Sequence, residues 1–202
     1  MTGTDTGVGK TLLSALLVAA TNRKYWKPIQ TGTSEGTDRE MVMKWADVAA
    51  DRTHPESFMF DRPVSPHLAA EQRGTAIDLN AIDRPSDPAP LVIEGAGGVL
   101  VPISRDAFMV DLILHFDTRV FVAARTGLGT INHTLLTVSA LRNAGAVVRG
   151  VVMIGKENAD NVRAVERYGN LPVVGLIPWL DVIDRQALCS VFDRHFAKTA
   201  FA

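Results

Sequence analysis

The sequence has a single cysteine, Cys189, and an almost even balance of charge, with a formal net charge of −1. One cysteine excludes an internal disulfide and is typical of a reducing compartment. The lack of net positive charge excludes the overall basic field that favours nucleic-acid binding. No apolar run is long enough to span a membrane, and no signal peptide precedes the first motif. We therefore expect a cytoplasmic protein that binds neither nucleic acid nor membrane.

The length and composition fit one globular domain. The chain has 202 residues, of which 47% are hydrophobic and 21% are charged, so it can bury a sizeable core. We expect residues 1–202 to form a single domain. Cys189 lies in an apolar segment with helical spacing, which favours a buried structural thiol over a nucleophile.

A phosphate-binding motif opens the chain. The stretch Gly3-Thr4-Asp5-Thr6-Gly7-Val8-Gly9-Lys10-Thr11 leads into an apolar segment that predicts a helix over residues 11–22. Glycines let successive N–H groups point at one phosphate chain, Lys10 can reach the outer phosphates, and the Thr11 hydroxyl can bind Mg²⁺. Five residues lie between Gly3 and Gly9 instead of the common four, so this is a variant phosphate loop. The alternative, a flexible glycine turn without a ligand, is disfavoured by the Gly-Lys-Thr ending.

The loop begins unusually early in the chain. A phosphate loop normally follows a buried strand, but only Met1 and Thr2 precede this one. We expect either that the first strand is truncated to a stub or that the native start lies upstream.

The remaining pattern predicts an α/β fold of the P-loop NTPase type, with a mostly parallel sheet and helices on both faces. Apolar runs alternate with helical segments, and such alternation gives parallel strands whose carboxyl ends bind ligands. A strand is expected at 25–29, where Pro28 indicates an edge or a strand end, and a loop-rich segment at 52–66. Further strands are expected at 91–94, 120–124, 151–154 and 173–177, and helices after Thr37 or Asp38 and at 67–73, 77–83, 108–116, 130–144, 160–168 and 184–198.

Two carboxylates are candidate Mg²⁺ ligands. Glu94 ends an apolar run beside glycines, where a buried carboxylate needs a cation or hydrogen-bond donors. Mg²⁺ beside a phosphate loop takes one or two carboxylates. For Glu94 the alternative is a structural cap on the glycine turn. Asp38 is the second candidate, and its alternative is a plain helix N-cap.

Two further features suggest anion binding. Lys27 lies in the apolar strand at 25–29, where it is either a second cation for a γ-phosphate or a solvated surface lysine. The turn at 127–133 precedes a helix, and its free N–H groups could hold a carboxylate. Alternatively, Asn132 and His133 only cap that helix.

Taken together, these stretches resemble dethiobiotin synthetase, an enzyme of biotin synthesis, over nearly the whole chain. The resemblance is carried by residues 2–11, Lys27-Pro28-Ile29-Gln30-Thr31-Gly32, Ser65-Pro66-His67, Glu94-Gly95-Ala96-Gly97-Gly98, Gly129-Thr130-Ile131-Asn132-His133-Thr134 and Ile177-Pro178-Trp179-Leu180. The phosphate loop alone is a weak signal. Its five-residue spacing, followed in order by the Lys-Pro and Glu-Gly motifs, is a specific set.

The resemblance implies a reaction. A vicinal diamine, 7,8-diaminononanoate, captures CO₂ as a carbamate, whose oxygen attacks the γ-phosphate of ATP or another nucleoside triphosphate. The second amine then closes a cyclic urea and expels phosphate. Such chemistry needs positioning and charge neutralisation, with no enzyme nucleophile.

The resemblance also implies residue roles. Lys27 and Lys10 would be catalytic, Thr11, Asp38 and Glu94 would hold Mg²⁺, and Lys27 and Thr31 would hold the carbamate. Nucleotide contacts are implied at Thr6, Gly7, Val8, Gly9, Lys10, Thr11, Asp38, Glu94, Gly155, Lys156, Pro178, Trp179 and Leu180. The diamine would be lined by Gly95, Ala96, Gly97 and Gly98, and its distal carboxylate would meet Gly129, Thr130, Ile131 and Asn132 of the second subunit of a homodimer.

The chain departs from the family pattern at two places besides its start. Gly7 stands where many members carry an acidic residue, and Gly155-Lys156 stand roughly where many carry Asn-Asp against adenine. We therefore expect weak selection of the base.

A second class of function is a P-loop ATPase switch of the partitioning or targeting type. Such a protein would not need Lys27 and Thr31, and it would be expected to carry a second lysine early in the loop, where Gly3 and Thr4 stand. A non-catalytic binding module is a third class, which the combination of Lys10, Thr11 and Glu94 disfavours.

Overall fold

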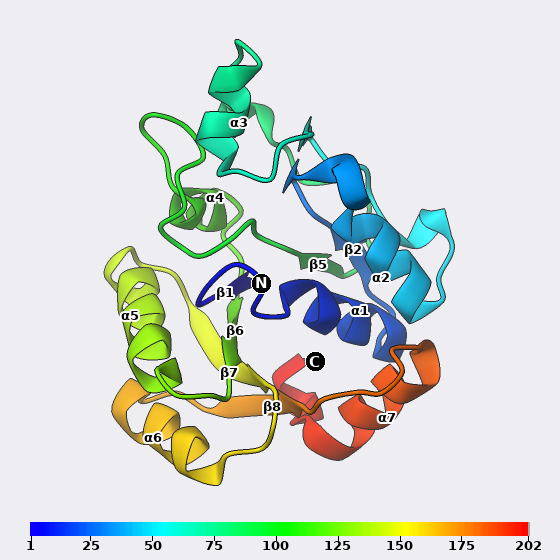
Figure 1. The fold of residues 1–202 in the computed structure, drawn as a ribbon, viewed down its shortest axis with the longest axis vertical. Coiled ribbons are helices and arrows are strands. Elements are labelled where there is room, and N and C mark those ends of the chain that lie inside the picture. Colours follow the sequence, from blue (N-terminus) through cyan, green and yellow to red (C-terminus); the bar gives the residue numbers. More distant parts are fainter. Residues whose placement is uncertain (202) are drawn as a thin grey trace.

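The computed structural model describes residues 1–201, without the side chain of Glu35, and shows helices on both sides of parallel strands (Figure 1). The strands are β1 (Thr2–Gly3), β2 (Lys24–Trp26), β3 (Ile29–Thr31), β4 (Phe58–Phe60), β5 (Leu91–Ile93), β6 (Val120–Arg125), β7 (Val148–Ile154) and β8 (Val173–Ile177). The α-helices are α1 (Lys10–Ala20), α2 (Asp38–Ala46), α3 (Pro66–Gln72), α4 (Met109–His115), α5 (Thr130–Asn143), α6 (Ala159–Gly169) and α7 (Arg185–His195). Short 3₁₀ helices are η1 (Thr33–Glu35), η2 (Ala50–Arg52), η3 (Leu79–Ala81) and η4 (Lys198–Phe201).

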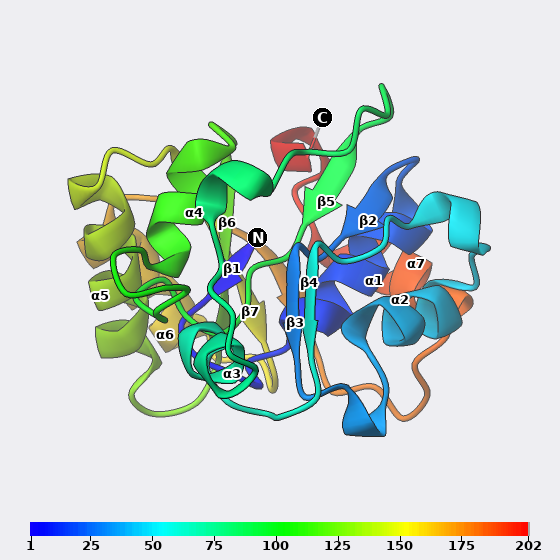
Figure 2. The same cartoon turned by 90° about the horizontal axis from the view of Figure 1, so that it is seen from above.

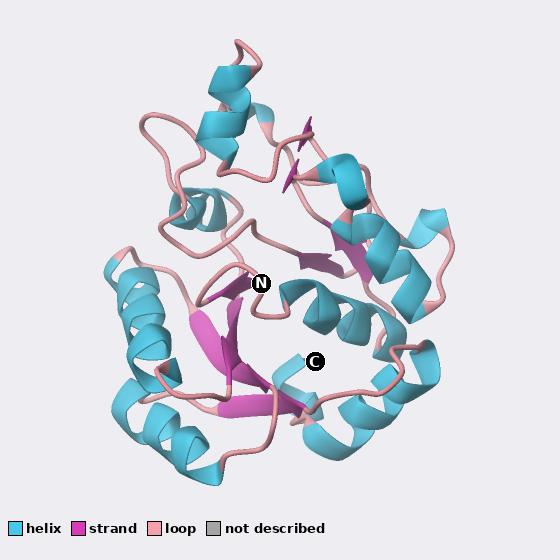
Figure 3. Cartoon of the chain, viewed as in Figure 1, coloured by secondary structure: helices cyan, strands magenta, loops and turns pink. Residues whose placement is uncertain are grey.

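The two faces of the main sheet bury alternate residues of its strands. Ala123 of β6 and Val152 of β7 face the core formed with α1 and α7. Their neighbours Val122 and Val151 face the core formed with α5 and α6. Figure 3 shows helices flanking these strands on both sides. The predicted α/β fold is confirmed, and Ala202, the last residue of the predicted domain, lies outside the described residues.

The parallel strands form three hydrogen-bonded groups instead of one continuous sheet. Within the described residues these are β1-β6-β7-β8, β2-β5 and β3-β4. Figure 2 shows β3 and β4 as a separate pair. The strand predicted over residues 25–29 is interrupted at Lys27 and Pro28, because a proline has no N–H for the ladder. Pro28 thus marks a strand end, as predicted.

The first strand is a stub, and it joins two of these groups. Thr2 pairs with Val122 and Gly3 with Ala123 of β6. On its other side, the carbonyl oxygen of Met1 accepts a hydrogen bond of 2.9 Å from the Gly95 N–H, just after β5. The phosphate loop therefore starts between the four-stranded group and the β2-β5 pair.

The segment 52–66 is rich in loop, as predicted, and it contains the short strand β4, which has three residues between prolines. One local expectation is wrong. The helix predicted over 77–83 is only the short η3, because Ile82 already leaves helical geometry. No helix of residues 1–201 is both long and apolar enough to cross a membrane.

Candidate active site

The phosphate loop curls between β1 and α1 with its glycines in the left-handed region. Gly7 has φ of 70° and Gly9 has φ of 101°, which side-chain-bearing residues rarely adopt. A Cβ atom at Gly9 would lie 2.8 Å from Ile154 Cδ1 at the end of β7. Gly9 caps α1 without a side-chain hydrogen bond. The first N–H groups of α1 therefore have the arrangement that suits a phosphate.

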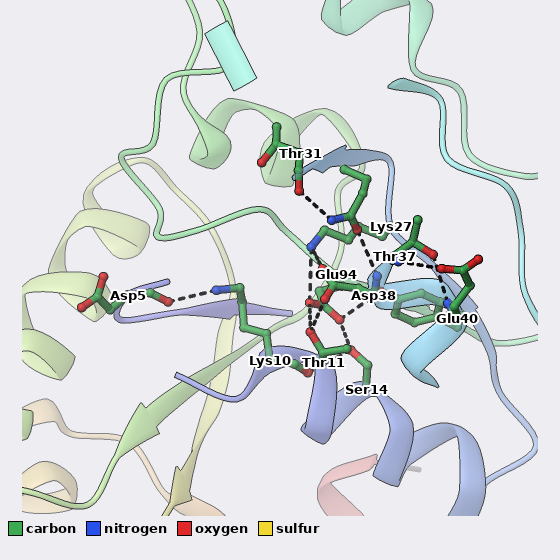
Figure 4. Close-up of polar contacts among 12 residues, drawn as sticks. Asp5, Lys10, Thr11, Ser14, Lys27, Thr31, Thr37, Asp38, Glu40 and Glu94 are labelled. Atoms are coloured by element: carbon green, nitrogen blue, oxygen red, sulfur yellow. Dashed lines mark hydrogen bonds and ion pairs between the residues drawn. The ribbon is translucent and has the colours of Figure 1, made fainter. Parts of the chain in front are cut away.

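Lys10 extends along this loop. Its side chain is buried, and Nζ donates a hydrogen bond of 2.9 Å to the carbonyl oxygen of Asp5 (Figure 4). Burial lowers the pKa of Lys10 to about 8, although the Glu94 carboxylate acts in the opposite direction. The carboxylate of Asp5 pairs with Arg125 at 2.8 Å. Its other oxygen accepts the Thr6 N–H at 2.7 Å, which fixes the tip of the loop.

Three oxygens meet next to the loop. Thr11 Oγ1 lies 2.9 Å from Asp38 Oδ1 and 3.0 Å from Glu94 Oε1 (Figure 4). The Thr11 hydroxyl has one hydrogen, so it satisfies only one of these contacts at a time. The other contact brings two lone-pair oxygens together, and a cation at this point would remove that conflict.

The donor set suits Mg²⁺. The possible ligands here are two carboxylates, those of Asp38 and Glu94, and the hydroxyl of Thr11. Among residues 1–201, no group of three or more Asp, Glu, His or Cys side chains is arranged to hold a metal ion. Mg²⁺ commonly takes one or two carboxylates and completes its shell with water and phosphate oxygens. Thr11, Asp38 and Glu94 fit this requirement beside a phosphate loop.

Asp38 is placed by the start of α2. Thr37 is the N-cap: its Oγ1 accepts the Glu40 N–H at 3.1 Å, and its own N–H donates to Glu40 Oε2 at 2.7 Å. This capping box leaves the carboxylate of Asp38 free to point at Thr11. The alternative of Asp38 as a plain N-cap is therefore wrong.

Lys27 occupies the break between β2 and β3. Only 7% of it is exposed. Its Nζ donates to Asp38 Oδ2 and lies 3.8 Å from Glu94 Oε1. Burial lowers its pKa, against the effect of the Glu94 charge. The alternative of a solvated surface lysine is wrong.

Glu94 follows β5, and its backbone N–H donates to Trp26 O at 2.9 Å. Its side chain is 1% exposed. Ser14 and Tyr25 donate to its second oxygen at 2.6 and 3.1 Å, and burial, followed by the Glu94 charge, raises the pKa of Tyr25 well above its usual value. Its side-chain bonds go to these groups and to Thr11 among the described residues, so the alternative of a cap on the glycine turn is wrong.

Sequence reasoning missed Ser14 and Tyr25. A signal was present, because Ser14 follows Thr11 by three residues and therefore shares its face of α1. Tyr25 gave no comparable signal.

The glycine segment after β5 lies against the phosphate loop. A Cβ at Gly97, whose φ is 67°, would lie 3.4 Å from Thr6 Oγ1, and one at Gly98 would lie 3.5 Å from Gly3 O. Residues 95–98 thus approach the loop closely. A cleft of about 310 Å³ opens here, lined by Thr4, Asp5, Thr6, Gly98, Val99, Leu100, Val101 and the α5 residues Leu136, Thr137 and Ala140.

Two other predicted positions, Thr31 and the turn before α5, make no direct hydrogen bond to Thr11, Lys27, Asp38 or Glu94 among the described residues. Thr31 ends β3, and its carbonyl oxygen accepts the Gln30 side-chain amide at 2.8 Å. The turn before α5 has Gly129 as N-cap, with φ of 88° and no side-chain cap bond, so the capping role for Asn132 and His133 is wrong. No hydrogen bond or ion pair among residues 1–201 joins this turn to Lys27 or Glu94.

The predicted base-contacting residues follow β7 and β8. The Gly155 N–H already donates to Ile177 O at 2.9 Å, and a Cβ at Gly155 would lie 2.5 Å from Thr126 Oγ1. Lys156 and Trp179 are exposed, while Pro178 and Leu180 are partly buried. A Cβ atom added at Gly9 would meet the Ile154 side chain, so this end of β7 adjoins the phosphate loop.

Comparison with known proteins identifies the family and the fold. The family model described as "AAA domain" matches residues 1–187. The chain is 45% identical to ATP-dependent dethiobiotin synthetase BioD of Novosphingobium aromaticivorans, covering 100% of this chain and 98% of that protein. It is 48% identical to the biotin biosynthesis bifunctional protein BioCD of Bordetella avium over 93% of this chain and 41% of that protein. A ParA family ATPase from Chlorobium tepidum superposes with a TM-score of 0.53 at 12% identity, covering 99% of this chain and 93% of that one, which shows a shared fold alone. The resemblance seen in the motifs is thus confirmed, and the chain belongs to the dethiobiotin synthetase family.

Proposed function

We propose that the protein joins CO₂ to 7,8-diaminononanoate and closes the cyclic urea of dethiobiotin at the expense of ATP. One observation supports this most. Lys27, a residue that a simple nucleotide switch does not require, is buried against Asp38 and close to Glu94. These carboxylates converge on Thr11 of the phosphate loop.

In the proposed reaction, one amine of the substrate adds to CO₂ and loses a proton to form a carbamate. A carbamate oxygen then bonds to the γ-phosphorus of ATP as the bond to ADP breaks, giving a carbamic–phosphoric anhydride. The second amine attacks the carbamate carbon, loses a proton and expels inorganic phosphate. The product is the five-membered cyclic urea, with ADP and phosphate.

The chain's own residues bind and neutralise charge. Residues 6–9 offer backbone N–H groups to the phosphates, and Lys10 exchanges its bond to Asp5 O for a phosphate oxygen. Lys27, with Thr31, holds the carbamate and balances charge on the transferring phosphoryl group. Thr11, Asp38 and Glu94 would hold Mg²⁺, which when bound neutralises charge on the phosphate oxygens.

The diamine chain is proposed to lie along the close-packed glycine segment, with Gly95, Ala96, Gly97 and Gly98 at its reacting end. The cleft beside it has exposed apolar side chains, Leu100 and Leu136, which suit a hydrocarbon chain. We propose that Gly129, Thr130, Ile131 and Asn132 of the partner subunit in a homodimer bind the far end of the diamine. Their N–H groups at the start of α5 would bind the distal carboxylate.

The base is proposed to lie near Gly155, Lys156, Pro178, Trp179 and Leu180. The N–H of Gly155 is already paired with Ile177, so little remains there to distinguish adenine. We also propose that residues 1–202 act as one domain in the cytoplasm, without nucleic-acid or membrane partners. The single cysteine and the near-zero net charge support this.

The test combines purified protein with ATP, Mg²⁺, bicarbonate and the diamine. We expect phosphate release that needs both bicarbonate and diamine, with dethiobiotin detected by mass spectrometry. Lys10→Ala serves as the inactive control. Phosphate release that ignores the diamine would instead identify a nucleotide switch.

A further inference from the structure

We infer that Ser14 and Tyr25 are positioning residues that hold one oxygen of Glu94, so that Glu94 offers only Oε1 to the metal and thereby favours Mg²⁺ over Ca²⁺. This inference rests on the proposed function, in which Glu94 is a Mg²⁺ ligand. It assigns a role to two side chains that act on the proposed metal site through Glu94.

The two oxygens of the Glu94 carboxylate have different partners. Oε2 accepts from Ser14 Oγ at 2.6 Å and from Tyr25 Oη at 3.1 Å. Oε1 lies 3.0 Å from Thr11 Oγ1 and 3.8 Å from Lys27 Nζ. Thus Oε1 faces the Thr11 hydroxyl and the Lys27 ammonium group, whereas Oε2 faces two neutral hydroxyl donors.

The donors themselves have little freedom. Ser14 and Tyr25 are both 0% exposed, so no bulk water replaces their bonds to Glu94. Ser14 Oγ also lies 3.0 Å from Lys10 O, but a hydroxyl has only one hydrogen. The 2.6 Å contact has the length typical of a hydroxyl donating to a carboxylate, so we infer that the Ser14 hydroxyl directs its hydrogen to Glu94 Oε2 and not to Lys10 O.

The number of free carboxylate oxygens affects which metal fits. Mg²⁺ requires near-octahedral geometry and short bonds, and a carboxylate serves it through one oxygen. Ca²⁺ accepts more ligands and readily takes both oxygens of one carboxylate. With Oε2 held by two hydroxyls, Glu94 cannot turn to chelate. Removing those hydroxyls would free the second oxygen.

The experiment uses the full chain loaded with a non-hydrolysable ATP analogue. Bound Mn²⁺ is followed by electron paramagnetic resonance and displaced by Mg²⁺ or Ca²⁺, which gives an affinity for each. The variants are Tyr25→Phe, Ser14→Ala and the double variant. Tyr168→Phe on the exposed side of α6 and Ser190→Ala in α7 are matched controls that lose the same atoms away from the site.

We expect each single variant to weaken Mg²⁺ binding about tenfold, as is typical when outer partners of a metal ligand are lost. Ca²⁺ affinity should change less, so the preference for Mg²⁺ falls by about tenfold or more in the double variant. A purely structural role would lower the melting temperature but leave this preference unchanged, and that result overturns the inference. Should the double variant not fold, the two single variants decide.

Glu94→Gln separates failure of the inference from failure of the proposed function. If Glu94→Gln leaves Mg²⁺ affinity unchanged, Glu94 is not a ligand, and both ideas are overturned. If Glu94→Gln weakens Mg²⁺ binding but the Ser14 and Tyr25 variants keep the wild-type preference, only the inference is overturned.

Discussion

Two buried lysines contact different groups, so replacing each of them should affect a different step, nucleotide binding or turnover. Lys10 bonds to the carbonyl oxygen of Asp5 in the phosphate loop, whereas Lys27 lies between the carboxylates of Asp38 and Glu94. We predict that Lys27→Ala lowers diamine-dependent turnover about a hundredfold, since charge moves most at the transferring phosphoryl group. Nucleotide affinity, measured by calorimetry, should change far less, whereas Lys10→Ala should weaken it strongly.

Two further variants serve as controls for the effect of Lys27→Ala on turnover. Lys27→Arg should not restore turnover, because a planar guanidinium cannot replace a compact ammonium in so enclosed a position. Lys198→Ala, which removes an exposed lysine paired with Asp193, should leave turnover unchanged. Near-normal turnover in Lys27→Ala would remove Lys27 from the site and weaken the proposed function.

Base selection is the second property decided by single residues. Gly155 has no side-chain amide, and its N–H is already bonded to Ile177 O. Strong rejection of a wrong base requires a buried polar partner that the wrong base leaves unsatisfied. We predict that ATP and CTP bind within about tenfold of each other, or about 1.4 kcal/mol. Calorimetry that gives ATP an advantage of several hundredfold would contradict this.

At the scale of elements, the N-terminus of α2 should affect both the stability of the protein and the binding of metal at the candidate site. Thr37 caps this helix, and the next residue is Asp38. Thr37→Ala should destabilise the protein by about 1 kcal/mol and lower Tm by about 2–4 °C. It should also weaken Mg²⁺ binding about tenfold, because the carboxylate of Asp38 is no longer held at a fixed helix end.

The matched control for that prediction is Asn158→Ala. Asn158 caps α6 through a bond to the Asn161 N–H at 3.0 Å. It should lower Tm by a similar amount and leave Mg²⁺ affinity unchanged. Equal Mg²⁺ affinity in both variants would show that the α2 cap acts on stability alone.

Most long elements follow from local sequence, and the errors have identifiable causes. The apolar runs of β6, β7 and β8 are buried on both faces, so their pattern alone reveals them. β4 has three residues beside prolines, and no local pattern distinguishes so short a strand from loop. The break at Pro28 was visible, but the division of the strands into three groups depends on contacts between distant segments.

The candidate site could likewise be predicted in part from the sequence. The glycine spacing of the phosphate loop and the position of Glu94 after a strand indicated that Glu94 lies beside this loop. The choice between a cap and a site residue at Asp38 needed the geometry of Thr37, which spacing leaves open. The bond from Tyr25 to Glu94 joins residues 69 positions apart and has no local signature.

At the scale of the whole molecule, the proposed dimer can be tested by mixing chains. If residues 129–132 complete the partner's site, Asn132→Ala and Lys10→Ala chains should each be inactive alone. A heterodimer of the two keeps one intact composite site, so we predict partial recovery of activity. Tagged, purified heterodimers provide the measurement, and mixed wild-type chains give the reference. No recovery in proven heterodimers would contradict a site shared between subunits.

The division of the strands also has a thermodynamic consequence. Lys10 and Thr11 follow β1 of the four-stranded group, whereas Lys27 and Glu94 follow β2 and β5 of a separate pair. A nucleotide held by both sets would act as a removable cross-link between the two groups. At about one hundred times its Kd it would add about 2.7 kcal/mol to the free energy of unfolding. Amide hydrogen exchange in β2 and β5 should therefore slow as nucleotide is added, because the nucleotide would strengthen a connection that otherwise depends on β1 and the shared core.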